Sequence, residues 1–238
     1  MIHVISGTGT DVGKTVATAA LAARELAQGR AVAIYKPTQT GVEGSEPGDV
    51  RNIAAWLDCP GRLSTAEGVR LREPMAPVDA ALVAGGQGAV QALPGLDEHC
   101  ERIRRLAAEY DTVLVEGAGG LLVTLGPEGA NIADLASAVD ARLVVVTRPD
   151  LGTLNHTALT LEAAVNRGFS RGTLLLGSFP DHPTALHCRN LQNLRAQAEH
   201  HRWHFAGAIP ELRMKGDIKE QLLSAGLSLS ILTAGAGS

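Results

Sequence analysis

The segment from Gly7 to Thr15 has the residue types and spacing to bind a phosphate. Residues 2–5 suit a strand and run into a glycine-rich stretch, after which Lys14 and Thr15 open an alanine-rich helical run. Backbone N–H groups of such a turn point inward, the helix N-terminus adds partial positive charge, and the lysine ammonium reaches terminal phosphates. The Thr15 hydroxyl stands where a magnesium ligand is expected.

This loop is a variant of the common P-loop. Thr8 occupies the position where that motif has its first glycine, and the flanking glycines are Gly7 and Gly9. A glycine-rich turn that binds nothing is the plain alternative. A strand before the loop and Gly-Lys-Thr at the start of a helix favour the phosphate site.

Lys36 is expected beside this loop. The apolar residues 31–35 read as a second strand, closed by Lys36 and Pro37. Strand, crossover helix and strand form a right-handed unit with parallel strands, and ligands of such sheets bind at the carboxyl ends of the strands. A solvated lysine at a strand end is the alternative interpretation of Lys36.

Two carboxylates are candidates for holding magnesium. Asp49 precedes a helical run over residues 50–57, where it could cap the helix, bind magnesium or do both. Glu116 ends the apolar run 112–115 and precedes Gly117, and an acid at the tip of such a strand holds magnesium or its water in P-loop proteins. A glutamate that merely emerges into solvent is the alternative.

The composition excludes several classes of protein. The 238 residues are 45% hydrophobic and 19% charged, as in a folded globular chain. Only 3% are aromatic and the net charge is −4 with no basic stripe, which argues against nucleic-acid binding. Three cysteines form no disulfide or metal pattern, and histidines 200, 201 and 204 lack further metal ligands.

No apolar run reaches the length of a membrane span. The chain enters its first predicted strand directly, which leaves no room for a signal peptide. We therefore expect a cytoplasmic protein with no membrane partner.

The remaining pattern alternates strands with helices. Further strands are predicted at 143–147, 173–176 and 205–209, and helices at 96–109, 131–139, 185–199 and 216–225. A helix opening at residues 151–156 could hold an anion such as a substrate carboxylate. Residues 59–95 are broken by proline and glycine, and we expect a surface excursion with a short helix at 78–84.

These elements predict the α/β class: a single-domain P-loop fold over residues 1–225, with a mostly parallel β-sheet and helices on both faces. Residues 226–238 are small and polar, and we expect them to form a frayed C-terminal tail.

Four segments together, GTGTDVGKT, YKPTQTG, VEGAGG and DLGTLNH, resemble the dethiobiotin synthetase family from Ile2 to about Leu212. The resemblance implies a magnesium-dependent ligase of biotin biosynthesis. Such an enzyme uses a nucleoside triphosphate to carboxylate 7,8-diaminopelargonate with CO2 and to close the ring of dethiobiotin, releasing nucleoside diphosphate and phosphate. It also implies a homodimer with the substrate site at its interface.

The resemblance assigns roles by position. Lys14, Lys36 and Thr10 match catalytic positions, and the magnesium positions fall on Thr15, Asp49 and Glu116. Substrate-binding positions fall on Lys36, Thr40, Gly152, Thr153, Leu154 and Asn155. Nucleotide-binding positions fall on Asp11, Val12, Gly13, Lys14, Thr15, Val16, Asp49, Glu116, Gly117, Ala118, Gly119, Gly177, Ser178, Pro210, Glu211 and Leu212.

One departure leaves the base preference open between ATP and other nucleoside triphosphates. Many members of the family have an asparagine that reads adenine where this chain has Gly177-Ser178, and a serine cannot make the two-point amide contact. The main alternative function is a partition-type regulatory P-loop ATPase. Those proteins usually carry an extra lysine at the position of Gly9, which weighs against that alternative.

Overall fold

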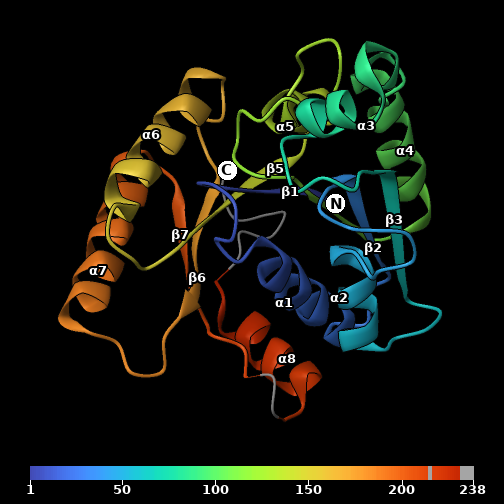
Figure 1. Cartoon of the computed structure of the whole chain (residues 1–238). Helices are drawn as coiled ribbons and strands as arrows, with labels where there is room; N and C mark the ends of the chain where they lie inside the picture. Colours follow the sequence, from blue (N-terminus) through green and yellow to red (C-terminus); the bar gives the residue numbers. More distant parts are fainter. Residues whose placement is uncertain (214–215, 231–238) are drawn as a thin grey trace.

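The computed structural model describes residues 1–213 and 216–230. Its centre is one seven-stranded sheet in the order β3-β2-β4-β1-β5-β6-β7, and every strand pair is parallel. The strands are β1 (Ile2–Gly7), β2 (Val32–Gln39), β3 (Leu63–Arg70), β4 (Thr112–Glu116), β5 (Arg142–Thr147), β6 (Thr173–Phe179) and β7 (His204–Pro210). The predicted α/β class with a parallel sheet is confirmed (Figure 1).

Helices cover both faces of this sheet (Figure 1). They are α1 (Lys14–Ala27), α2 (Asp49–Leu57), α3 (Pro77–Gln91), α4 (Leu96–Glu109), α5 (Ile132–Ala138), α6 (Thr153–Asn166), α7 (Ala185–His200) and α8 (Ile218–Ser228). Alternate strand residues face opposite cores: Val4 packs with α4 to α7, and Ile5 packs with α1, α2 and α8. Burial on both faces explains why the central strands are continuous apolar runs.

The strand order places the candidate site at the carboxyl ends of the central strands. The central strand β1 lies between β4 and β5, and β2 lies beyond β4. Because parallel strands end at the same edge, the loop after β1, Lys36 of β2 and Glu116 of β4 are brought together. Among the described helices, none is both long enough and apolar enough to cross a membrane.

The segment 59–95 is more regular than its sequence indicated. It contains β3, an edge strand paired with β2, and the helix α3, which is interrupted by non-helical backbone at Gly85 and Gly86. The sequence of β3, LSTAEGVR, has no period-two alternation because every residue in this edge strand is half-buried. The expected surface excursion was therefore wrong for this strand. The predicted short helix at 78–84 is confirmed, because the first helical stretch of α3 ends at the glycine pair.

β2 also extends beyond its predicted end. It continues through Pro37 to Gln39, so Lys36 lies inside the strand and not at its end. The pairing of β2 with β4 stops at Tyr35, and further along β2 pairs with β3 alone. Pro37 is tolerated because one side of β2 has no partner strand there.

The C-terminal boundary differs from the prediction. The last helix, α8, ends at Ser228, three residues beyond the expected end at Ala225. Gly226 packs against α1, Leu229 is buried, and the backbone N–H of Ser230 donates to the Ala206 carbonyl at 3.0 Å. Residues 226–230 are therefore ordered and packed, and the rest of the predicted tail, 231–238, lies outside the described residues.

Candidate nucleotide and substrate site

The loop between β1 and α1 has the backbone of a phosphate cradle. Gly13, at the N-cap of α1, has a φ of 95°, in the left-handed region that favours glycine. A side chain at Gly7 would approach Val12 to 2.6 Å, so the loop closes tightly on itself. The Lys14 ammonium is folded back on this loop and donates to the Gly9 carbonyl at 2.7 Å.

Lys14 is a buried lysine that forms no ion pair with any residue in the described part of the chain. Burial, with a further contribution from the nearby Lys36 ammonium, lowers the pKa of Lys14 to about 8. An incoming triphosphate would supply the negative charge that this ammonium lacks, so the site is electrostatically prepared for an anion.

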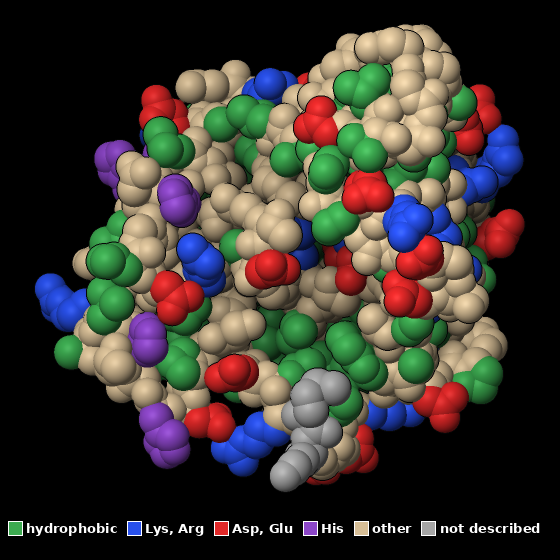
Figure 2. All heavy atoms as spheres, in the orientation of Figure 1, with side chains coloured by type: hydrophobic (Ala, Val, Ile, Leu, Met, Phe, Trp, Pro, Cys, Tyr) green, Lys and Arg blue, Asp and Glu red, His purple; other side chains and the backbone are tan. Residues whose placement is uncertain are grey.

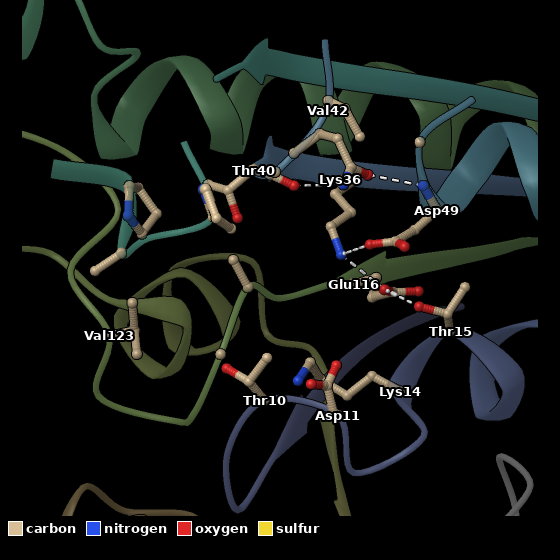
Figure 3. A pocket seen from close by; sticks show the side chains of 18 of the residues that line it. Thr10, Asp11, Lys14, Thr15, Lys36, Thr40, Val42, Asp49, Glu116 and Val123 are labelled. Carbon is tan, nitrogen blue, oxygen red and sulfur yellow. Dashed lines mark hydrogen bonds and ion pairs between the residues drawn. The ribbon is translucent and has the colours of Figure 1, made fainter. Parts of the chain in front are cut away.

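Lys36 lies between two carboxylates. Its ammonium donates to Asp49 Oδ2 and, at 2.7 Å, to Glu116 Oε1, which also accepts the Thr15 hydroxyl at 2.9 Å (Figure 3). Burial lowers the pKa of Lys36, but the charges of Glu116 and Asp49 outweigh it and hold the pKa above its ordinary value. Lys36 is therefore charged, and the alternative of a Glu116 that emerges into solvent is wrong, because this side chain is fully buried beside the ammonium.

The same side chains offer oxygens that suit magnesium. Glu116 is fully buried, and its Oε2 atom has no hydrogen-bond partner within residues 1–213 and 216–230, which is costly unless a further cation is present. The Thr15 hydroxyl and the Asp49 carboxylate complete a set of hard oxygen donors, the type that magnesium prefers. No group of three or more histidine, cysteine, aspartate or glutamate side chains that could hold a metal occurs in the described ranges, and this site offers two carboxylates and the Thr15 hydroxyl.

Asp49 does not cap its helix. Gly48 is the N-cap of α2 and has no side chain to offer, while Asp49 is the first helical residue and directs its carboxylate to Lys36. Of the two roles that the sequence left open, the capping role is wrong. The backbone N–H of Asp49 is satisfied instead by Gln39 Oε1 at 2.8 Å.

A cavity of about 750 Å³ opens over these groups. In Figure 2, basic and acidic side chains lie close together in the hollow at the middle of this face. The expected site residues that line the cavity are Thr10, Asp11, Gly13, Lys14, Thr15, Val16, Lys36, Thr40, Asp49, Glu116, Ala118, Gly119 and Ser178. These residues come from four separate parts of the sequence, which the fold brings together.

Ser178 and its neighbours lie beside the phosphate loop. A side chain at Gly177 would approach the Val12 carbonyl to 2.4 Å, so β6 ends directly against the loop. Pro210 pairs with Phe179 in the sheet. The cavity lining does not include Val12, Gly117, Gly177, Pro210, Glu211 or Leu212, whose assignment to nucleotide binding stays a prediction.

The start of α6 lies outside this cavity. Gly152 has a φ of 91° and is exposed, as is Asn155, whereas Thr153 is buried and its hydroxyl contacts that of Thr147 at 2.7 Å. The Thr147 hydroxyl also accepts from Thr8 at 3.4 Å, which links the phosphate loop to α6. The substrate role of Gly152, Thr153, Leu154 and Asn155 stays a prediction.

Several cavity residues were missed from the sequence. They include Gln39, Gly48 and an apolar wall made of Val42, Pro74, Met75, Ala76, Pro77 and Val123. The proline-rich segment 74–77 had been assigned to the irregular excursion, and its only signal was its apolar character. Gln39 lies two residues beyond Pro37, past the predicted end of this strand.

A seven-stranded parallel sheet with this loop, two lysines and two carboxylates defines a P-loop nucleotide-binding protein. A family profile described as "AAA domain" matches residues 3–216. The chain is 44% identical to the ATP-dependent dethiobiotin synthetase BioD of Parafrankia sp., over 88% of this chain and 83% of that protein. It is 46% identical to the protein of the same name from Rhodococcus jostii, over 82% and 81%. The chain belongs to the dethiobiotin synthetase family.

Solved structures with more distant sequences share the fold. The MinC:MinD cell division protein complex of Aquifex aeolicus has a TM-score of 0.56 at 14% identity, covering 95% of this chain and 93% of that one. The apo McdA structure of Cyanthece has a TM-score of 0.55 at 14% identity, covering 94% of this chain and 90% of that one. At such identities these proteins indicate the architecture alone.

Proposed function

We propose that this chain is a magnesium- and ATP-dependent dethiobiotin synthetase that acts as a cytoplasmic homodimer. It would carboxylate 7,8-diaminopelargonate with CO2, close the ring and release ADP and phosphate. The observation that carries the proposal is the position of Lys36, buried between Asp49 and Glu116 in the cavity that also holds Lys14. Membership of the synthetase family supports this interpretation.

The proposed reaction brings two anions together. One substrate amine takes up CO2 and loses a proton to give a carbamate, and a carbamate oxygen then attacks the γ-phosphorus as ADP leaves. The second amine attacks the carbonyl carbon, loses a proton and expels phosphate as the ring closes. The carbamate and the triphosphate repel each other, so cations must lie between them.

The chain supplies two of these cations. Lys14, at the start of α1, would hold the β- and γ-phosphates, and Lys36 would hold the carbamate and the phosphoryl group in transfer. Thr15, Asp49 and Glu116 would hold magnesium, which when bound would neutralise charge on the phosphate oxygens.

The proposed substrate lies along the cavity. Its diamine end would lie beside Thr10, Thr40 and Lys36, which all line the cavity. Its carboxylate would reach the exposed start of α6, Gly152 to Asn155, of a second copy of the chain. Leu151, next to Gly152, is 80% exposed and would add apolar area to such a contact.

The base preference is part of the proposal. Ser178 lines the cavity next to Gly13, and a serine lacks the paired donor and acceptor of an amide. We infer that ATP is used and that other nucleoside triphosphates compete with it better than they would at a site with asparagine. A partition-type regulatory function has less support, since this chain has Gly9 at the position where those ATPases typically have a lysine.

Product analysis tests the function. The chain is mixed with diaminopelargonate, bicarbonate, magnesium and each nucleoside triphosphate in turn, and the products are identified by mass spectrometry. We expect a product that has gained one carbonyl and lost two hydrogens, together with released phosphate. Hydrolysis of the nucleotide without that product, for every triphosphate, would contradict the proposal and favour a regulatory ATPase.

A further inference from the structure

Gln39 forms hydrogen bonds with two residues that line the cavity, Asp49 and Thr40. Its side chain is buried, its Oε1 atom accepts the backbone N–H of Asp49 at 2.8 Å, and its Nε2 atom donates to the Thr40 carbonyl at 3.1 Å. Asp49 is a proposed magnesium ligand and Thr40 is a proposed substrate contact, and both line the cavity. A single amide therefore ties both to the end of β2.

The contact with Asp49 replaces a helix cap. Helices begin with N–H groups that need acceptors, and an aspartate near the start often supplies one with its own carboxylate. Here Gly48 has no side chain and Gln39 satisfies the Asp49 N–H. The carboxylate of Asp49 is left available for Lys36, with which it forms an ion pair.

Gly48 packs tightly against Gln39 and Glu67, which fixes the position of the loop before α2. A Cβ atom at Gly48 would lie 2.7 Å from Gln39 Oε1 and 2.6 Å from Glu67 Oε1. Arg70 pairs with Glu67 at 2.6 Å and also donates to the Glu46 carbonyl at 2.6 Å. The loop before α2 is therefore clamped to the edge strand β3, with Gln39 beneath it.

We propose that Gln39 is a positioning residue that acts through Asp49. It fixes the start of α2 so that the Asp49 carboxylate faces Lys36 and the magnesium position, an assignment that rests on the proposed function. Groups that act on phosphoryl transfer are sensitive to small displacements, and a shift of about 1 Å can cost about 100-fold in rate. Loss of the Gln39 amide should therefore weaken magnesium binding.

The test replaces Gln39 by methionine, which keeps the length and removes both hydrogen bonds. Gln91→Met, the same change at an exposed position at the end of α3, is the matched control. ADP is titrated by calorimetry at a series of magnesium concentrations. We expect Gln39→Met to raise the magnesium concentration for half-saturation and to lower kcat by about 10- to 100-fold, and Gln91→Met to leave both unchanged.

A double-mutant cycle separates positioning from general damage. In an Asp49→Asn background, Gln39→Met should cause little further loss of magnesium-dependent binding or kcat, because its effect passes through Asp49. A loss of binding or kcat in the double variant equal to the product of the two single-variant factors would overturn the proposal. So would a lowered melting temperature of Gln39→Met with an unchanged magnesium dependence.

Two provisions keep the test decisive. If Gln39→Met does not fold, Gln39→Asn, which keeps the amide but shortens its reach by one methylene, takes its place with the same expected outcomes. The calorimetric titration needs no turnover. A wild-type chain that makes no dethiobiotin would therefore overturn the proposed function while leaving the positioning role of Gln39 to be judged on magnesium-dependent binding.

Discussion

Charge balance explains the individual residues of the site. Lys14 and Lys36 oppose Asp49 and Glu116 in a cavity where water screens poorly, so each charge depends on the others. Only Lys36 is fully paired, and Lys14 rests on a carbonyl. Under the proposed function, the Lys14 ammonium would bind phosphate, and Glu116 Oε2, which has no hydrogen-bond partner among the described residues, would bind a cation.

Lys36→Ala should lower kcat by about 100- to 1000-fold, because it removes a charge contact on the group in transfer. Affinity for the nucleotide should change little, since Lys14 and the loop are untouched. Lys219→Ala, at an exposed position, serves as the control. Steady-state kinetics and a nucleotide titration check this, and a near-normal kcat for Lys36→Ala would contradict the role.

Binding of the triphosphate should draw a proton onto Lys14. With a pKa of about 8 in the free site, Lys14 is largely neutral at about pH 9, and the phosphates stabilise its charged form. Affinity should therefore fall as the pH rises through 8. Calorimetry at about pH 9 in two buffers of different ionisation enthalpy measures the proton uptake, which should disappear in Lys14→Met; equal proton uptake by that variant would rule out Lys14 as its source.

At the scale of elements, close backbone contacts hold the helices that carry the site. The helix α8 packs on α1, whose first residue is Lys14, and the contact point is Gly226. A Cβ atom at Gly226 would lie 2.1 Å from the Ala20 carbonyl oxygen. The end of the chain therefore supports the helix that begins the phosphate site.

Gly226→Ala should destabilise the protein by about 1–3 kcal/mol, because the added methyl group forces α8 away from α1. Gly88→Ala is the matched control: it also lies inside a helix, but apart from its chain neighbours and its own helix backbone no atom of the described residues lies within 4 Å of the added Cβ. It should stabilise by about 0.5–1 kcal/mol. Urea unfolding measures the free energy of unfolding of both variants. Equal changes in the two variants would show that the α1–α8 contact is not tight.

For the whole molecule, two buried histidines set a limit on acid stability. His3 in the central strand and His99 in α4 are both buried, and burial lowers the pKa of each to about 4. The unfolded chain takes up these protons near pH 6.5, well before the folded one. Stability present above about pH 6.5 is therefore lost as the pH falls towards 4.

As the pH falls from 7 to 5, each histidine should lower the free energy of unfolding by about 2 kcal/mol. His99→Gln should show a smaller loss over this range than the wild type, and His200→Gln, at an exposed position, should match the wild type. Urea unfolding at the two pH values provides the measurement. A His99→Gln variant with the full acid loss would show that His99 is protonated in the folded state.

The sequence by itself determined the class of fold, the phosphate loop and the family. Apolar runs such as residues 112–115 and the Gly-Lys-Thr start of α1 are local patterns, and local patterns specify strands, turns and helix starts. Lys14, Thr15 and Glu116 could be singled out as candidates for the same reason, since they lie where strands end and helices begin.

Only the tertiary structure decided how these residues act on one another. Lys36 reaches Asp49 across 13 residues and Glu116 across 80, and Gln39 takes over the capping role that Asp49 could have had. The edge strand β3 and the packing of Gly226 on α1 were likewise hidden. Strand pairing, ion pairing and close packing depend on residues distant in the chain, which no local pattern encodes.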